Sequence, residues 1–188
     1  VHIPGANGRG TNYIVTDDRV YMVEGNQCHV LDAANGKIIQ DIEMPQETSG
    51  EQREWGYIGV YGDLLLGGFG YANYRDRNDL TFESDGKLRG NRSGYGSKSL
   101  ERAASMGLVV FDRHSGDVLW QADARHSFWH NGIIAGDGKI FCLDRTPELI
   151  EAALRRRGKS RAASYRIVAF NAQTGDVAAL RVLDVVVI

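Results

Sequence analysis

The chain has 188 residues, of which 43% are hydrophobic and 24% are charged, and its formal net charge at pH 7 is −2. This composition is typical of a globular protein that buries a sizeable core, and the charge gives no indication of a nucleic-acid partner. No apolar run approaches the roughly 18 residues that a membrane span needs, so we expect no span. We also expect no signal peptide in this chain, because no charged segment followed by an apolar one stands at its start.

The first predicted unit covers residues 11–45 and contains two hairpins. In YIVTDDRVYMV (13–23), short apolar runs flank a polar turn, which is typical of a β-hairpin. In HVLDAANGKIIQ (29–40), Asp32 can accept hydrogen bonds from the backbone two residues on, and Gly36 can supply the positive φ of a bulged turn. The unit is therefore predicted to hold four short antiparallel strands.

The same two stretches return twice, at about residues 55–124 and 131–188. The second copy centres on Asp112 and Gly116. The third copy centres on Asn171 and Gly175. Two sets of apolar residues also occupy matching positions in the three copies, which predicts that they lie in the core. Three further apolar residues are expected in the core as well. These core positions are Ile14, Ile58 and Ile133 in one set, Val20, Leu64 and Ile140 in the other, and Val110, Trp120 and Val168.

Both later copies carry an insert between their second and third strands. Residues 70–106 are rich in Gly, Asn, Arg and Ser, so we expect a long loop with little structure of its own. In the insert at 144–165, Pro147 suits the first position of a helix and Gly158 can end it. The sequence therefore predicts one helix, near 147–157.

The stretch VFDRHSGDVLW (110–120) is similar to the pyrroloquinoline-quinone-type repeat, whose consensus resembles A-x-D-x-x-T-G-x-x-x-W. In the third copy AFNAQTG (169–175) matches until Ala179 replaces the Trp, and Gln40 stands there in the first copy. In that family the Trp docks between adjacent blades, so the resemblance assigns this role to Trp120 alone. The resemblance implies an all-β fold, a β-propeller of four-stranded antiparallel blades, of which about three are present.

Three blades leave the ring of a propeller incomplete. Propellers close with roughly four to eight blades, because closure hides the strand edges. We expect the chain to be a fragment of a longer protein, so that its partners are the remaining blades of the parent propeller. The alternative is that further copies of the chain assemble to complete the ring.

The resemblance bears on function through the proteins that carry this repeat. They include quinone-dependent alcohol dehydrogenases, an outer-membrane assembly scaffold and uncharacterised secreted bacterial propellers, and residues 9–37 look most like the planctomycete-type members of the last group. The resemblance implies a periplasmic or extracellular bacterial protein and favours a non-catalytic scaffold or binding module. The alternative is a part of a quinone-dependent dehydrogenase, or of a propeller joined to another catalytic domain.

The quinone enzymes of this family resemble one another in having adjacent cysteines over the cofactor, whereas Cys28 and Cys142 lie far apart in this sequence. No catalytic residue can be carried over, and we predict no cofactor. Pyrroloquinoline quinone and calcium could bind only if the missing blades supplied the ligands. Both cysteines lie in apolar alternating stretches, which indicates buried free thiols rather than a disulfide.

A binding face is predicted where the inserts emerge. Turns along an up-and-down sheet alternate between its two ends, so both inserts and the connections between blades share one face. The residues that could contact a protein or a small ligand there are Trp55, His126, Trp129, His130 and Asn131. His126 and His130 would lie about 13 Å apart in an extended chain, too far to share a zinc ion, so we expect no metal. The alternative is that these side chains only pack and form hydrogen bonds between blades.

Overall fold

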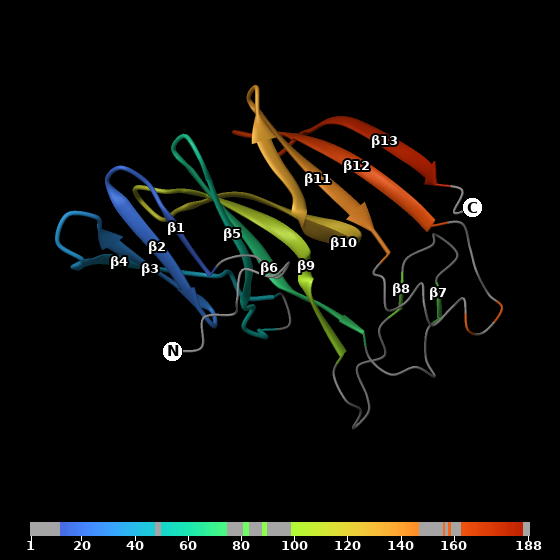
Figure 1. Cartoon of the computed structure of the whole chain (residues 1–188), viewed down its shortest axis with the longest axis horizontal. Coiled ribbons are helices and arrows are strands. Elements are labelled where there is room, and N and C mark those ends of the chain that lie inside the picture. The colour runs from blue at the N-terminus through green and yellow to red at the C-terminus, as the bar shows by residue number, and fades with distance from the viewer. Residues whose placement is uncertain are drawn as a thin grey trace.

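The computed structural model describes residues 12–47, 50–74, 81–82, 88–89, 99–146, 156, 158 and 163–185. These residues form antiparallel β-sheets, and among them only Arg156 is helical (Figure 1). Within this part of the chain, no helix has the length and apolar character that a membrane crossing requires. The strands are β1 (Tyr13–Val15), β2 (Arg19–Glu24), β3 (Gln27–Asp32), β4 (Ile38–Glu43), β5 (Trp55–Tyr61), β6 (Leu64–Tyr74), β7 (Thr81–Phe82), β8 (Leu88–Arg89), β9 (Ser99–Asp112), β10 (Val118–Gly136), β11 (Lys139–Arg145), β12 (Ala163–Asn171) and β13 (Val177–Val185).

The main strands form three consecutive four-stranded units, which we call blades. Blade 1 is the sheet β1-β2-β3-β4, and a seven-stranded sheet in the order β13-β12-β11-β10-β9-β6-β5 holds the other two. β10 belongs to both, because its first part pairs with β9 and its last part pairs with β11. Blade 2 is therefore β5, β6, β9 and the first part of β10, and blade 3 is the rest of β10 with β11, β12 and β13. The predicted all-β fold of four-stranded antiparallel blades is confirmed.

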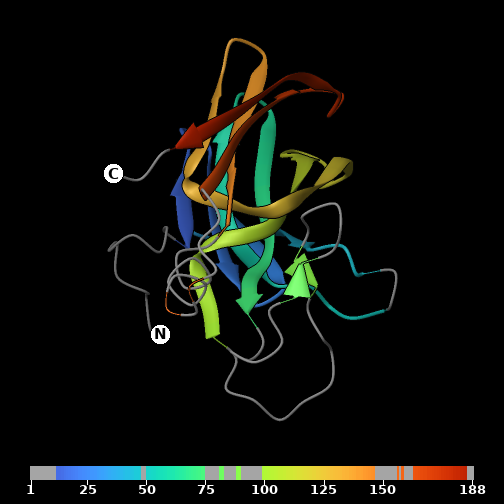
Figure 2. The same cartoon turned by 90° about the vertical axis from the view of Figure 1, so that its right-hand side faces the viewer.

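The described blades do not close into a ring. Blade 1 lies at one end of the molecule and β13 at the other (Figure 1). Seen from the β13 side, blade 1 lies behind the other strands (Figure 2). Blades 1 and 3 therefore each turn one face away from the other described blades.

Each blade joins its third and fourth strands by the same turn. An Asp or Asn side chain accepts backbone N–H bonds from the residues two and three positions on, at 2.8–3.1 Å. A glycine four positions on has a φ of 71°, 80° or 75°, and its N–H donates to the carbonyl of that Asp or Asn. The predicted turns are thus confirmed in all three copies. The pairs are Asp32 with Gly36, Asp112 with Gly116, and Asn171 with Gly175.

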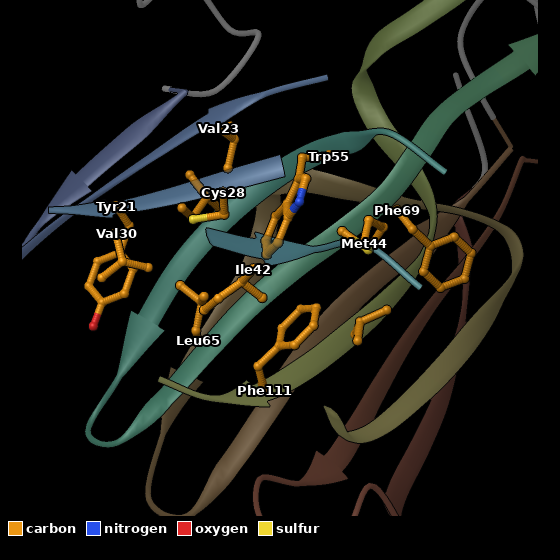
Figure 3. Packing of buried hydrophobic residues seen from close by; sticks show 12 residues of the cluster. Tyr21, Val23, Cys28, Val30, Ile42, Met44, Trp55, Leu65, Phe69 and Phe111 are labelled. Carbon is orange, nitrogen blue, oxygen red and sulfur yellow. The ribbon is translucent and has the colours of Figure 1, made fainter. Parts of the chain in front are cut away.

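Two hydrophobic clusters fill the spaces between the blades, and the first is seen in Figure 3. Of the predicted core positions all are buried except Ile14 and Val20, which are only partly buried. The cluster between blades 1 and 2 contains Tyr21, Val23, Cys28, Val30, Ile42, Met44, Trp55, Ile58, Leu65, Phe69, Val109 and Phe111. The cluster between blades 2 and 3 contains Leu64, Leu66, Leu108, Val110, Trp120, Phe128, Ile133, Ile140, Cys142, Val168, Phe170 and Ala172.

The strand register corrects the alignment of the copies. Val15 pairs with Val20 across the first hairpin of blade 1, and Val60 pairs with Leu65 across that of blade 2. The equivalent of Val20 is therefore Leu65, whereas the sequence alignment placed Leu64 there. A shift of one residue turns a side chain to the other face of the sheet, so Leu65 packs between blades 1 and 2 and Leu64 packs between blades 2 and 3.

Trp120 docks between blades 2 and 3, as the resemblance implies. Its indole N–H donates to the Ala172 carbonyl at 2.9 Å, and its ring lies against Gly175, where a Cβ atom would come within 2.6 Å of the ring. Gln40 occupies the same position in blade 1, and its amide donates to the His114 carbonyl of blade 2 at 3.2 Å. At both interfaces an N–H donor in this position therefore bonds the turn of the next blade.

An ion pair joins blades 1 and 2 at the ends that carry these turns. The Arg113 guanidinium donates to the Asp18 carboxylate at 2.8 Å and to the Tyr21 hydroxyl at 3.1 Å. The hydrogen bond from Arg113 lowers the pKa of Asp18 from 3.8 to about 2, and a second bond from Thr16 acts in the same direction. The carboxylate thus remains charged well into the acid range.

We expect Asp18→Asn to reduce the acid sensitivity of the protein between about pH 4 and pH 2. A carboxylate with a lowered pKa in the folded state stabilises that state above the unfolded pKa, and this contribution is lost as the pH falls through the folded value. Urea midpoints measured across this window should therefore fall more steeply for the wild type than for Asp18→Asn. Asp17→Asn, at an exposed neighbour in the same turn, is the control and should keep the wild-type slope. Equal slopes for all three proteins would contradict this role of the ion pair.

The insert in blade 2 contains more strand than the sequence predicts. β6 continues to Tyr74 and β9 begins at Ser99, and these two residues pair, while β7 and β8 pair with each other. The expectation of a loop with little structure over 70–106 was wrong for these segments, because the ladder between β6 and β9 extends beyond the blade. The helix predicted at 147–157 lies outside the described residues, apart from Arg156.

Cys28 and Cys142 are both buried free thiols, as predicted. Burial raises the pKa of the Cys28 thiol to about 12. It also raises the pKa of Cys142, far above its ordinary value. Neither sulfur is therefore a thiolate at neutral pH, which is the form that a reactive cysteine needs.

Candidate functional site

The predicted binding face includes the irregular part of β10, where the chain passes from blade 2 to blade 3. The fully buried Asp144 of β11 holds this segment. Its carboxylate accepts backbone N–H bonds from Arg125 and His126, both at 2.9 Å, and from Ser127 at 3.2 Å. The Arg166 guanidinium donates to the same carboxylate at 2.6 Å. A buried charge is tolerated when it is paired and hydrogen-bonded in this way, so Asp144 fixes the backbone of the passage.

His130 lies in the interior of the protein, where only 3% of it is exposed. Its Nε2 atom is 2.8 Å from the Ser105 hydroxyl of β9, and its ring centroid is 5.6 Å from that of Tyr57 in β5. Burial raises the pKa of Tyr57 to about 12, so this phenol stays neutral. His130 thus connects β10 to strands β5 and β9 of blade 2.

A serine and a histidine at this distance could act as a nucleophile and its general base. However, Ser105 is fully buried and lies against the backbone of two glycines. A Cβ atom at Gly56 would come within 2.6 Å of the Ser105 Oγ, and one at Gly68 within 2.5 Å. No room is left for a substrate carbonyl at this oxygen. In this arrangement the pair is a structural hydrogen bond between β9 and β10.

Trp129 and Arg145 form a basic and aromatic cluster at the insert-bearing end of blade 3. The guanidinium carbon of Arg145 lies 3.3 Å from the centroid of the Trp129 ring and 5.8 Å from that of Tyr165. Arg145 is buried, yet its Nε, like the indole Nε1 of Trp129, meets no acceptor in the described part of the chain. A stacked cation with N–H groups to spare suits an anionic partner, because charge-assisted hydrogen bonds are strong.

The structure does not bring Trp55 to this cluster. Trp55 belongs to the core between blades 1 and 2, where its ring stacks on Phe111 at 5.3 Å and its indole N–H donates to the Asn26 carbonyl at 3.1 Å. Asn131 is exposed, and His126 is half-buried. Among the described residues, no group of three or more His, Cys, Asp or Glu side chains could hold a metal ion.

Sequence reasoning missed the residues that organise this region. Asp144 and Arg145 follow an apolar strand stretch, and Ser105 and Arg166 precede one. The available signal is the pair Asp144–Arg145, which interrupts the alternation of β11 with two adjacent charges. Charged side chains are rarely buried unless they have partners, so this interruption could have identified a polar network.

No model of a known protein family matches this sequence, and no curated protein sequence matches it. Among solved structures, BamB from Moraxella catarrhalis is 13% identical, with a TM-score of 0.45 over 96% of this chain and 40% of that one. The quinohemoprotein alcohol dehydrogenase ADHIIG from Pseudomonas putida HK5 is 13% identical, with a TM-score of 0.49 over 92% of this chain and 20% of that one. A europium-containing methanol dehydrogenase is 15% identical, with a TM-score of 0.49 over 88% of this chain and 30% of that one.

This chain therefore spans 40% or less of the length of each of these structures. At such identities and TM-scores the likeness carries no argument about activity. The functional conclusion depends on the geometry of the blades and of the cluster around Arg145.

Proposed function

We propose that the chain is a non-catalytic segment of a β-propeller that acts as a scaffold or binding module of the pyrroloquinoline-quinone-type repeat. The observation that carries the proposal is the cluster of Arg145 and Trp129 on rigid strands, whose buried Nε and indole N–H groups meet no acceptor among the described residues. The other polar groups of the region serve the fold, because Asp144 holds the backbone and Ser105 bonds His130. The insert-bearing end of blade 3 is then the contact surface, and an acidic group is its partner.

The proposal extends to the setting of the protein. Uncovered blade faces suit a propeller that is completed by further blades, which belong to a longer chain or to further copies. The resemblance of the repeat to secreted bacterial propellers supports a location in the periplasm or outside the cell. The role of a scaffold fits this setting, because rigid blades position loops for contacts with other proteins.

A titration with a hexaglutamate peptide tests the contact surface. The chain has three Trp residues, and the indole N–H groups of Trp55 and Trp120 already donate to backbone carbonyls. We expect the Trp129 indole signal in a ¹H–¹⁵N NMR spectrum, assigned with Trp129→Phe, to shift saturably. Arg145→Ala should abolish the shift. Lys37→Ala, at an exposed cation in the turn of blade 1, is the control and should preserve it.

Two outcomes would overturn the proposal. The first is an unchanged Trp129 signal at every peptide concentration, which would remove the contact surface. The second is saturable binding of pyrroloquinoline quinone with calcium to this chain, which would favour the alternative of a dehydrogenase segment.

A further inference from the structure

The two faces of each blade can be compared position by position, because residues that pair in register share a face of the sheet. One face of each blade points towards the next blade along the chain. Its two central rows are apolar in all three blades, and in blades 1 and 2 the next blade covers them. The rows are Tyr21–Val30 and Val23–Cys28 in blade 1, Leu66–Val110 and Gly68–Leu108 in blade 2, and Phe141–Ala169 and Leu143–Ile167 in blade 3.

In blade 3 no other described blade covers this apolar face. Ile134, which pairs with Phe141, is 63% exposed, and Ile167 is 37% exposed. The equivalents of Ile167 in the other blades, Cys28 and Leu108, are fully buried. At both interfaces within the chain, the next blade covers the equivalent apolar face.

Blade 1 carries the complementary face, which no other described blade covers. Tyr13 and Val15 occupy the positions that Ile58 and Val60 occupy in blade 2, where both pack against blade 1. Tyr13 is 47% exposed and Val15 is 58% exposed. Val20, Met22 and Leu31 continue this apolar surface. Blades 1 and 3 therefore carry the two kinds of face that meet at an interface between neighbouring blades.

The two uncovered faces have opposite charge. In the described rows of these faces, blade 3 has three basic residues and no carboxylate, and blade 1 has three carboxylates and no Lys or Arg. Opposite charges across an interface select the partner and speed association. The residues are Lys139, Arg145 and Arg181 on blade 3, and Glu24, Asp41 and Glu43 on blade 1.

We propose that blade 1 of a second copy of this chain covers the open face of blade 3. The inference rests on the proposed propeller function and identifies one partner of its binding face. The contact is head to tail, like the two interfaces within the chain. Two copies provide six blades, which lies within the roughly four to eight blades of closed propellers, so a closed dimer forms if the rotation allows it.

One contact at this interface is weaker than its internal counterparts. Blade 3 has Ala179 in the position of Trp120, so no indole reaches the turn of the next blade. The facing turn of blade 1 has room for one, because a Cβ atom at Gly36 would meet nothing within 4 Å. The dimer should therefore dissociate on dilution, and Ala179→Trp should strengthen it.

Light scattering over a wide range of protein concentrations tests the proposal. We expect the mass to rise towards twice that of the chain, and high salt to weaken the association. Ile134→Asp and Val15→Asp, on the two faces, should each leave the chain monomeric. Val177→Asp is the matched control, because Val177 is 59% exposed and pairs with Phe170 on the opposite face of blade 3. Far-UV circular dichroism is the check that each variant is folded.

A gain of affinity gives a second, independent measurement. Ala179→Trp should lower the dissociation constant of the dimer by about tenfold, the effect of roughly one well-packed aromatic contact. Gly36→Val in the same chain should cancel this gain, because its side chain fills the space for the indole.

The proposal is overturned if wild type and Ala179→Trp are both monomeric at every concentration, or if a dimer survives both Ile134→Asp and Val15→Asp. The failure of this interface is distinguishable from the failure of the proposed binding surface. Arg145 lies at the insert-bearing end of the same face, but the hexaglutamate titration reads the Trp129 indole and light scattering reads the mass. A monomer that still binds the peptide would remove only the second copy.

Discussion

Asp144→Ala is expected to lower the free energy of unfolding by about 3–5 kcal/mol, the cost that roughly follows removal of one partner from a buried ion pair. The substitution leaves the Arg166 guanidinium without its carboxylate and three backbone N–H groups without an acceptor. Each unsatisfied buried donor costs about 1–3 kcal/mol, so the losses here reinforce one another. Urea unfolding followed by circular dichroism measures the effect.

The controls separate this role from a general effect of charge. Asp123→Ala, at an exposed carboxylate of β10, should change the stability by less than about 0.5 kcal/mol. Asp144→Asn keeps an acceptor but loses the charge, so its loss should be intermediate. Amide hydrogen exchange at Arg125, His126 and Ser127 should accelerate in Asp144→Asn. A loss in Asp144→Ala no larger than in Asp123→Ala would contradict the assigned role.

The blades could be predicted because their signals are local. The Asp or Asn that bonds the backbone and the glycine four residues later define each turn, and the alternation of apolar residues on either side defines the strands. These features can be recognised without knowing which distant residues come into contact. The role of Trp120 followed from the repeat in the same way, and its bond to Ala172 confirms it.

The candidate site could be predicted only in part, because it depends on which face of a strand each residue occupies. Trp55 was grouped with Trp129 since both lie between blades in the sequence, yet Trp55 packs towards blade 1. A shift of one residue in the strand register moves a side chain to the other face of the sheet, and the sequence alone does not determine the register. The backbone N–H partners of Asp144 lie 17 to 19 residues earlier, on an irregular segment that no periodicity marks.

The insert in blade 2 illustrates the same limit. Gly and Asn are depleted in strands, so composition favours a loop over 70–106. The extension of β6 to Tyr74 arises from pairing with Ser99, a contact between residues far apart in the sequence. Strand formation there depends on the partner strand more than on intrinsic preference.

The glycines of the three turns offer the second large effect, because they share a backbone conformation but differ in what lies next to them. Gly36, Gly116 and Gly175 all have a φ between 71° and 80°, so alanine is strained at each by about 1 kcal/mol. The difference lies in the space for a Cβ atom. At Gly36 it would meet nothing within 4 Å, at Gly116 it would lie 3.1 Å from Ile42, and at Gly175 it would lie 2.6 Å from the Trp120 ring.

Gly175→Ala is therefore expected to lower the stability by about 2–4 kcal/mol, because overpacking at a rigid aromatic ring adds about 1–3 kcal/mol to the backbone strain. Gly36→Ala should lose only about 1 kcal/mol. Gly116→Ala should fall between them, since the Ile42 side chain can move aside. Urea midpoints in dilute solution, where single chains dominate, give the ranking. Equal losses in the three variants would mean that backbone strain alone limits these turns and that the docked indole contributes little to holding blades 2 and 3 together.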